Sequence, residues 1–226
     1  MLPGPADPPP LTLDDLLASA TKFSRLLSAT PIPSLFGVTD GKAVGTHVEA
    51  TFNSYIGEHF THAAGNAAKG IDFPTLNVDL KVTSKKQPQS SSPFRDATQK
   101  VYGLGYHLLL FVYEKSDDRR LQSARLDIRH LVFINSKNTA DFQTTTGIAH
   151  ILGNSGNVDD IDAFLHERNL PLDDIGRRNL ANRIISEPPE IGSLTISNAL
   201  QWRLQYGRAI ALASQGHLPG VRDINA

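Results

Sequence analysis

The sequence predicts an α/β protein: a mixed β-sheet core flanked by helices, followed by a C-terminal helical region. Three observations predict this class. Apolar residues recur at helical spacing up to about residue 64, they alternate or run continuously between residues 70 and 134, and helical spacing returns from about residue 140. Helical and strand signals are therefore interleaved along the first part of the chain, which is typical of a sheet covered by helices.

The N-terminal elements begin after a proline-rich segment. Residues 1–10 cannot hold a helix or a ladder strand, so we expect a disordered or extended leader. An amphipathic helix is predicted over 11–28, with Thr12 or the Asp14 and Asp15 pair at its start. A second helix is predicted over 44–64, and its apolar stripe is Val48, Phe52, Tyr55, Ile56 and Phe60.

The middle of the chain carries the strand signals. Residues 70–83 alternate with a period of two and predict a strand pair that turns at residues 74–77. Residues 84–92 are polar and predict a loop, and Ser92 followed by proline predicts the start of a helix over 93–102. Further strands are predicted over 106–114 and 121–134, which completes a core of about residues 44–135.

The C-terminal part, about residues 138–215, is expected to be helical. Trp202 is predicted to be a core residue. The helices are predicted over 140–152, 158–168, 173–186 and 196–214.

Composition limits the function classes. The chain has 226 residues, a formal net charge of −1 and no cysteine. The length suits a single domain over residues 11–226. Disulfides, thiolate metal sites and a cysteine nucleophile are excluded, so any metal must be held by oxygen or imidazole. No apolar run reaches the roughly 20 residues of a membrane span, and we expect no membrane partner and a cytoplasmic location.

Three charged residues on the predicted strand pair suit a metal centre. Asp79 and Lys81 lie on the same face of one strand, and Asp72 lies on the strand paired with it. Two carboxylates at the end of a hairpin suit Mg²⁺, and a neighbouring lysine can position a water or stabilise a developing phosphate charge. The residues alone leave open the alternative that these charges form a solvated strand face.

The same segment carries a resemblance to a known superfamily. The order helix, Asp-containing strand, strand with (Asp/Glu)-x-Lys, helix, strand resembles the PD-(D/E)xK nucleases. The stretch IDFPTLNVDLKVTS is similar to type II restriction endonucleases and to mismatch-repair nicking endonucleases, with Asp79 where the latter have Glu. KVTSKKQPQSSSPF and QKVYGLGYHLLLFVYEK also resemble restriction-endonuclease sequence, so the match covers about residues 58–115.

The resemblance implies roles for individual residues. Asp72 and Asp79 would bind Mg²⁺, helped by the Leu80 carbonyl, and Lys81 would orient the attacking water. Glu58 stands where this family has a helical glutamate and would support a second metal or the water network. Helical periodicity by itself does not choose between Glu58 and Glu49, which lie on opposite flanks of the apolar stripe.

Candidate DNA contacts follow closely after the catalytic strand. A nearly neutral protein needs local positive charge to bind a polyanion, and glutamine amides and serine hydroxyls can contact bases or phosphates. For each candidate residue, the alternative is a side chain of a solvated polar loop that does not contact DNA. The candidates are Lys85, Lys86, Gln87, Gln89, Ser90, Ser91, Arg95 and Lys100.

The expected function is that of a type II restriction endonuclease: Mg²⁺-dependent, sequence-specific hydrolysis of double-stranded DNA. A homodimer is expected because two related active sites cut both strands of a palindromic site. A cognate DNA methyltransferase is expected as a genetic partner, not as a bound one. The alternatives are a nicking or repair nuclease of the same fold and a non-catalytic DNA-binding module.

Zinc at Glu58, His59 and His62 is disfavoured, since the spacing fits no HExxH motif.

Overall fold

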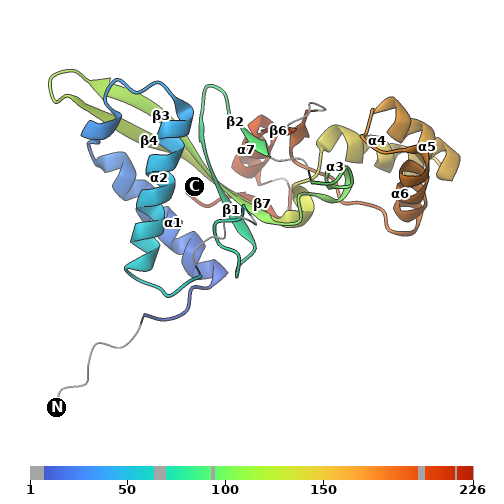
Figure 1. Ribbon diagram of the computed structural model, residues 1–226, viewed down its shortest axis with the longest axis horizontal. Coiled ribbons are helices and arrows are strands. Elements are labelled where there is room, and N and C mark those ends of the chain that lie inside the picture. The colour runs from blue at the N-terminus through green and yellow to red at the C-terminus, as the bar shows by residue number, and fades with distance from the viewer. Residues whose placement is uncertain (1–7, 64–69, 93–94, 198–201, 217, 226) are drawn as a thin grey trace, which may run out of the picture. The chain divides into compact units, whose positions relative to one another are not determined.

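The computed structural model describes residues 8–63, 70–92, 95–197, 202–216 and 218–225 (Figure 1). Contacts divide the chain into two compact units. The first unit consists of Met1–Pro88, Leu108–Phe133 and Asp223–Ala226, and the second of Gln89–His107 and Ile134–Arg222. In the described parts of both units, no helix is long and apolar enough to cross a membrane.

The first unit builds a sheet covered by two helices. Its four-stranded sheet has the order β1-β3-β4-β7. Helices α1 and α2 lie side by side, and α2 packs on β1 (Figure 1). The elements are α1 (Leu13–Ala29), the 3₁₀ turn Pro33–Leu35, α2 (Gly41–Gly57), β1 (Val78–Ser84), β3 (His107–Asp118) and β4 (Ser123–Ile134), together with Asp223 at the end of β7 (Val221–Asp223).

An aromatic cluster joins these layers. Phe52 of α2 has its ring centroid 5.1 Å from that of Phe23 on α1 and 5.4 Å from that of Phe111 on β3. All three side chains are buried. Aromatic rings bury large apolar areas, so this cluster fixes α2, and with it one wall of the candidate site, against the sheet.

The last described residues of the chain complete the first unit. The Leu131 backbone N–H on β4 donates to Asp223 Oδ1 at 3.2 Å, and the Ile224 N–H donates to the Leu131 carbonyl at 2.8 Å. The Ser24 hydroxyl of α1 donates to Asn225 Oδ1 at 3.0 Å. Residues 223–225 are therefore tied to both β4 and α1.

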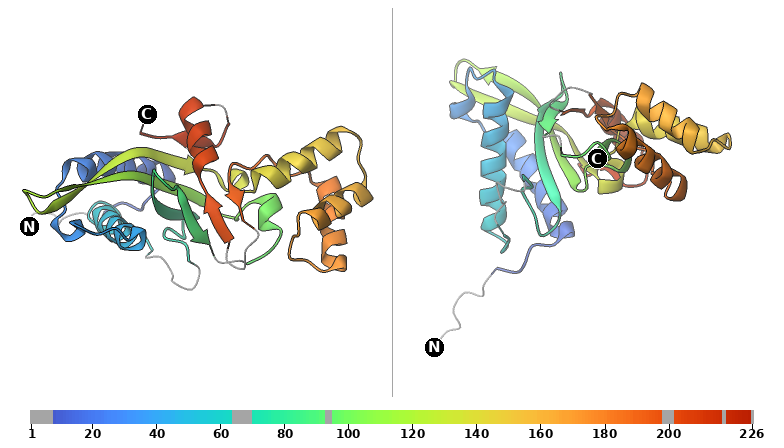
Figure 2. Two further views of the ribbon diagram at one scale, coloured as in Figure 1. Left: turned by 90° about the horizontal axis from the view of Figure 1, so that it is seen from above. Right: turned by 45° about the vertical axis from the view of Figure 1, so that its right-hand side comes forward.

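The second unit combines helices with a small antiparallel sheet of order β2-β6-β5 (Figure 2). Helices α4, α5 and α6 pack against one another and bury a shared apolar cluster that includes Ile148, Ile161 and Leu180. The elements are β2 (Gln89–Ser92), α3 (Gln99–Tyr102), the 3₁₀ turn Ser136–Asn138, α4 (Phe142–Gly153), α5 (Val158–Glu167), α6 (Asp174–Ser186), β5 (Thr195–Ile196), β6 (Trp202–Gln205) and α7 (Gly207–Gln215).

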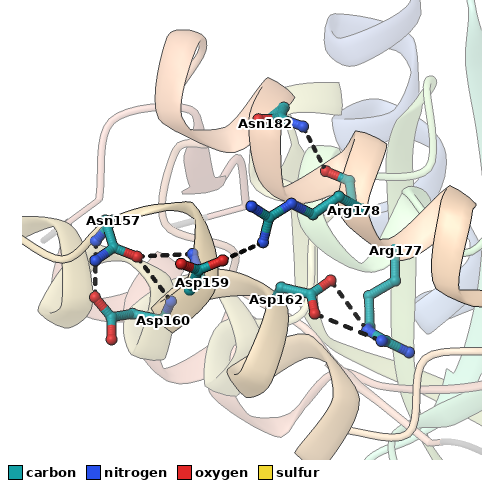
Figure 3. A network of polar contacts seen from close by, with 7 residues as sticks. All are labelled: Asn157, Asp159, Asp160, Asp162, Arg177, Arg178 and Asn182. Carbon is teal, nitrogen blue, oxygen red and sulfur yellow. Dashed lines mark hydrogen bonds and ion pairs between the residues drawn. The ribbon is translucent and has the colours of Figure 1, made fainter.

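Ion pairs join α5 to α6 (Figure 3). Arg177 Nε lies 3.1 Å from Asp162 Oδ1, and Arg178 pairs with Asp159. Asn157 caps α5 by accepting from the backbone N–H of Asp159 at 2.7 Å. The first pair is half-buried and the second is exposed, and together they direct both guanidinium groups towards carboxylates of the same unit.

Several predicted boundaries are wrong, each for a physical reason. The second helix ends at Gly57 instead of about residue 64, because the chain then turns and Thr61 pairs with the N-terminal segment: its N–H donates to the Pro9 carbonyl at 2.9 Å. Residues 8–10 are thus extended and hydrogen-bonded, and residues 1–7 of the predicted leader lie outside the described part of the chain.

The second unit holds the other differences. Residues 89–92, predicted as a loop, form β2 because they pair with β6. The helix predicted over 93–102 begins only at Gln99, and its first residues, 93 and 94, lie outside the described ranges. The helix predicted over 196–214 is replaced by β5, β6 and the shorter α7, while residues 198–201 are not among those described. Trp202 is buried, as predicted.

Candidate active site

Strand β1 places Asp79 and Lys81 on one side of the sheet. Lys81 Nζ lies 2.7 Å from Asp79 Oδ2, so the two form an ion pair. The Asp79 side chain is almost entirely buried, at 3% exposure, whereas that of Lys81 is 22% exposed. The ammonium group therefore lies between a buried carboxylate and the solvent.

A tight turn brings Asp72 to the same strand. Phe73 and Val78 form an antiparallel bridge, and Asn77 closes the turn with a left-handed φ of 55°. Asparagine tolerates this conformation better than most residues. Asp72 Oδ2 then accepts a hydrogen bond from the Leu80 backbone N–H at 2.8 Å. The turn predicted from residues 74–77 is thus present, and it fixes the Asp72 carboxylate next to β1.

Burial and a like charge act on Asp79. Desolvation raises the pKa of Asp79 to about 7; Lys81 opposes this rise, and the neighbouring Asp72 adds to it. The Lys81 ammonium group thus offsets only part of the cost of burying a charged carboxylate. In the metal-free protein, Asp79 changes its charge near neutral pH, and a bound cation would favour the ionised form.

Glu49 of α2 interacts electrostatically with Asp72 and Lys81. Its pKa is raised by burial and by the charge of Asp72, and the charge of Lys81 lowers it. Gly45, one turn earlier, lies where α2 faces β1, since a Cβ there would be in ordinary van der Waals contact with the Val82 Cβ at 4.0 Å.

Glu58 has a different setting. It is the C-terminal capping residue of α2 and is exposed, and its backbone N–H donates to the Ser54 carbonyl. The charges of Asp72 and Lys81 therefore act on Glu49, the helical glutamate that periodicity leaves as the alternative to Glu58.

The donor set suits a hard divalent cation. Asp72 and Asp79 offer carboxylate oxygens, the ligands that Mg²⁺ prefers, and Mg²⁺ commonly takes one or two carboxylates and completes its shell with waters and substrate phosphate oxygens. In the described ranges, no three His, Asp or Glu side chains are arranged as a complete metal cage. The residues thus fit a metal that shares its shell with water and substrate.

The predicted DNA contacts fall into two groups. Lys85, Lys86 and Gln87 form an exposed turn directly after β1, in the first unit. Gln89, Ser90, Ser91 and Arg95 belong to the second unit. Ser91 and Arg95 are exposed, but the Ser90 hydroxyl lies 2.5 Å from the Tyr206 hydroxyl.

Lys100 is not part of a basic surface, in contrast to the prediction. It is only 2% exposed, and burial lowers the pKa of its ammonium group while the charge of Asp141 raises it. The local sequence could not reveal this, because Asp141 lies far along the chain.

Comparison with known proteins identifies the family. The family model described as type II restriction enzyme NspV matches residues 10–223. Type II restriction enzyme NspV of Nostoc sp. is 55% identical over 205 residues, which cover 91% of this chain and 93% of that protein. No solved structure matches the chain. With the family model spanning nearly the whole chain, including the strand of Asp79 and Lys81, this protein belongs to the NspV family of type II restriction enzymes.

Proposed function

We propose that Asp72, Asp79 and Lys81 form the centre with which this type II restriction enzyme hydrolyses double-stranded DNA at a specific short sequence, with Mg²⁺ as the metal. The observation that carries the proposal is the 2.7 Å contact of Lys81 Nζ with the buried Asp79, beside an Asp72 held by the Leu80 N–H. Restriction endonucleases typically use a divalent metal, and the oxygen donors at this site suit Mg²⁺.

Each residue has a distinct task. Asp72 and Asp79 would hold the metal, which would supply Lewis-acid stabilisation of the charge that develops on the phosphate oxygens. Lys81 donates hydrogen bonds to the attacking water and to a non-bridging oxygen, where the transition state gathers negative charge. Asp79 holds the Lys81 ammonium group in place through their ion pair.

A helical carboxylate completes the centre in this proposal. The resemblance implies Glu58 for this role, and the electrostatic contact of Glu49 with Asp72 and Lys81 favours Glu49. We assign the role to Glu49: a partly buried carboxylate beside Asp72 can orient a water or support a second metal.

The exposed turn after β1 is proposed to hold the DNA backbone. Lys85 and Lys86 lie within a few residues of Lys81, so their ammonium groups extend the positive charge next to the centre. Gln87, in the same turn, offers an amide to a base edge or a phosphate. Gln89, Ser91 and Arg95 are proposed DNA contacts in the second unit, whereas the Ser90 hydroxyl is engaged by Tyr206.

Digestion of unmethylated phage and plasmid DNA tests the proposal. The wild-type protein is expected to give discrete fragments with Mg²⁺ and none with EDTA. Asp79→Ala and Lys81→Ala are each expected to lower cleavage by at least about 10³-fold, because each removes a group on which the transition state depends.

Two exposed residues serve as matched controls. Asp127→Ala on β4 and Lys42→Ala on α2 remove the same charges away from the centre and are expected to cut like the wild type. Wild-type cleavage by Asp79→Ala would contradict the proposed centre. Open circles without linear DNA would favour a nicking enzyme, and Mg²⁺-independent binding without cleavage would favour a DNA-binding module.

A further inference from the structure

The sheet of the second unit has two different faces. Along β6, Trp202 and Leu204 are buried, whereas Arg203 and Gln205 are exposed. On β5, Ile196 is buried. Because side chains alternate between the faces of a strand, the apolar residues cover the interior of the second unit and the polar ones lie together on the opposite face.

The strand register defines this polar face. Gln89 of β2 pairs with Gln205 of β6, and Ser91 pairs with Arg203. Thr195 of β5 pairs with Gln205 on its other side. We call Gln89, Ser91, Thr195, Arg203 and Gln205 the polar face of the β2-β6-β5 sheet. Ser90 points to the opposite side, where its hydroxyl meets that of Tyr206.

The polar face carries positive charge and no negative charge from the three strands. None of the residues assigned to β2, β5 and β6 is Asp or Glu. Arg203 is exposed, and its guanidinium group has no ion-pair partner among the residues that the structure describes. This differs from Arg177 and Arg178 of α6, which are paired with carboxylates of α5. The face therefore offers an unneutralised guanidinium group flanked by amides and hydroxyls.

These groups match the edges of base pairs. Arginine binds the O6 and N7 of guanine in a bidentate manner, glutamine does the same with the N6 and N7 of adenine, and Ser or Thr contacts either. The major groove admits a two-stranded β-ribbon, and the longer part of this sheet is the β2–β6 pair. Residues two apart on a strand lie about 6.7 Å from each other, close to two base-pair steps of about 3.4 Å each.

We propose that the polar face of the β2-β6-β5 sheet reads the recognition sequence in the major groove, with Arg203 as its main specificity-determining residue. Arg203 binds a guanine, and Gln205, two positions along β6, contacts a base pair about two steps away. This inference rests on the proposed function, since it assigns the base-reading surface of the same DNA-cleaving enzyme.

Cleavage of defined duplexes tests the inference. The wild-type site is first mapped from fragment ends in unmethylated phage DNA. Duplexes that carry this site, or the site with one base pair changed, are then cut under single-turnover conditions. Arg203→Ala and Arg203→Lys are expected to lower cleavage of the cognate site about 10- to 100-fold and to lose discrimination at one G·C position only. Lysine keeps the charge but lacks the planar fork, so Arg203→Lys separates base reading from simple phosphate attraction.

Two comparisons make the outcome decisive. Arg25→Lys, at an exposed position on α1, is expected to leave rate and discrimination unchanged. The intensity and thermal loss of Trp202 fluorescence report whether β6 stays folded in each variant. Equal slowing on every duplex, or wild-type behaviour of folded Arg203→Ala, would overturn the inference. Failure of the wild type to cut any DNA would instead contradict the proposed function, so the two failures are distinguishable.

Discussion

The Asp79 carboxyl group makes the stability of the metal-free protein depend on pH. Its pKa is raised from 3.8 to about 7, chiefly by burial. A group whose pKa is higher in the folded state contributes stability below its unfolded pKa, and this contribution is lost as the pH rises through the folded pKa. In EDTA, stability is therefore expected to fall between about pH 4 and pH 7.

Asp79→Asn isolates this effect. The variant removes the buried charge, so it is expected to be more stable than the wild type at pH 8 in EDTA, by on the order of 4 kcal/mol or about 10 °C in Tm. At pH 4, where the wild-type group is protonated, the two should agree closely. Thermal unfolding by circular dichroism measures both, with the exposed Asp127→Asn as control. A stability difference independent of pH would contradict the burial argument.

Glu49 and Glu58 form a second comparison at the residue scale. Glu49→Gln is expected to lower cleavage by about 10- to 100-fold, because it removes a carboxylate that interacts with Asp72 and Lys81. Glu58→Gln, at the exposed end of α2, is expected to cut at nearly the wild-type rate. Single-turnover rates with saturating Mg²⁺ measure both, and the reverse ranking would return the role to Glu58.

The residues of the centre differ in how far the sequence predicts them. Asp79 and Lys81 are two apart on a strand, and this spacing alone places them on one face, where the structure has them paired. Glu49 needs more than helical spacing, because both flanks of an amphipathic helix carry a glutamate. Which flank faces β1 is decided by the packing of α2 on that strand, and helical periodicity carries no information about this packing.

At the scale of elements, local sequence patterns do not predict the strands of the small sheet. β2 and β6 are four residues each, and their hydrogen-bond partners are separated by more than 100 positions in the chain. The long, strongly apolar β3 and β4 were predicted because their signals are local. The helix pattern assigned to residues 196–214 fails for the same reason: Trp202 and Leu204 fit period two once β2 supplies a partner.

The loop after α3 offers a test of packing between elements. Gly103 has a φ of 89°, and a Cβ there would lie 2.4 Å from the Ser136 carbonyl oxygen. Gly105 has a nearly equal φ of 87°, with no atom within 4 Å of such a Cβ. Gly103→Ala is therefore expected to destabilise by about 2 kcal/mol more than Gly105→Ala.

Urea unfolding followed by fluorescence checks this comparison. The single tryptophan, Trp202, is buried in the second unit and so reports on its unfolding. Equal midpoints for the two variants would show that backbone strain, and not the contact with Ser136, dominates at both glycines.

At the scale of the whole molecule, we expect a homodimer on DNA. Two copies place one centre on each strand of a palindromic site. Light scattering is expected to give the mass of one duplex plus twice that of the 24.6 kDa chain when a cognate duplex and Ca²⁺ are present. Plasmid digestion should convert supercoiled DNA to linear DNA with little open circle. A monomeric complex that accumulates open circles would contradict the dimer.

The attachment of residues 223–225 to β4 and α1 has a consequence for synthesis on the ribosome. Residues 134–222, most of the second unit, are translated between β4 and the segment that completes the first unit. At about 5–20 residues per second, this interval lasts roughly 5–20 s. A nascent chain that already contains β1, β3 and β4 therefore lacks the final contacts of its four-stranded sheet. Completion of the first unit is coupled to translation of the second.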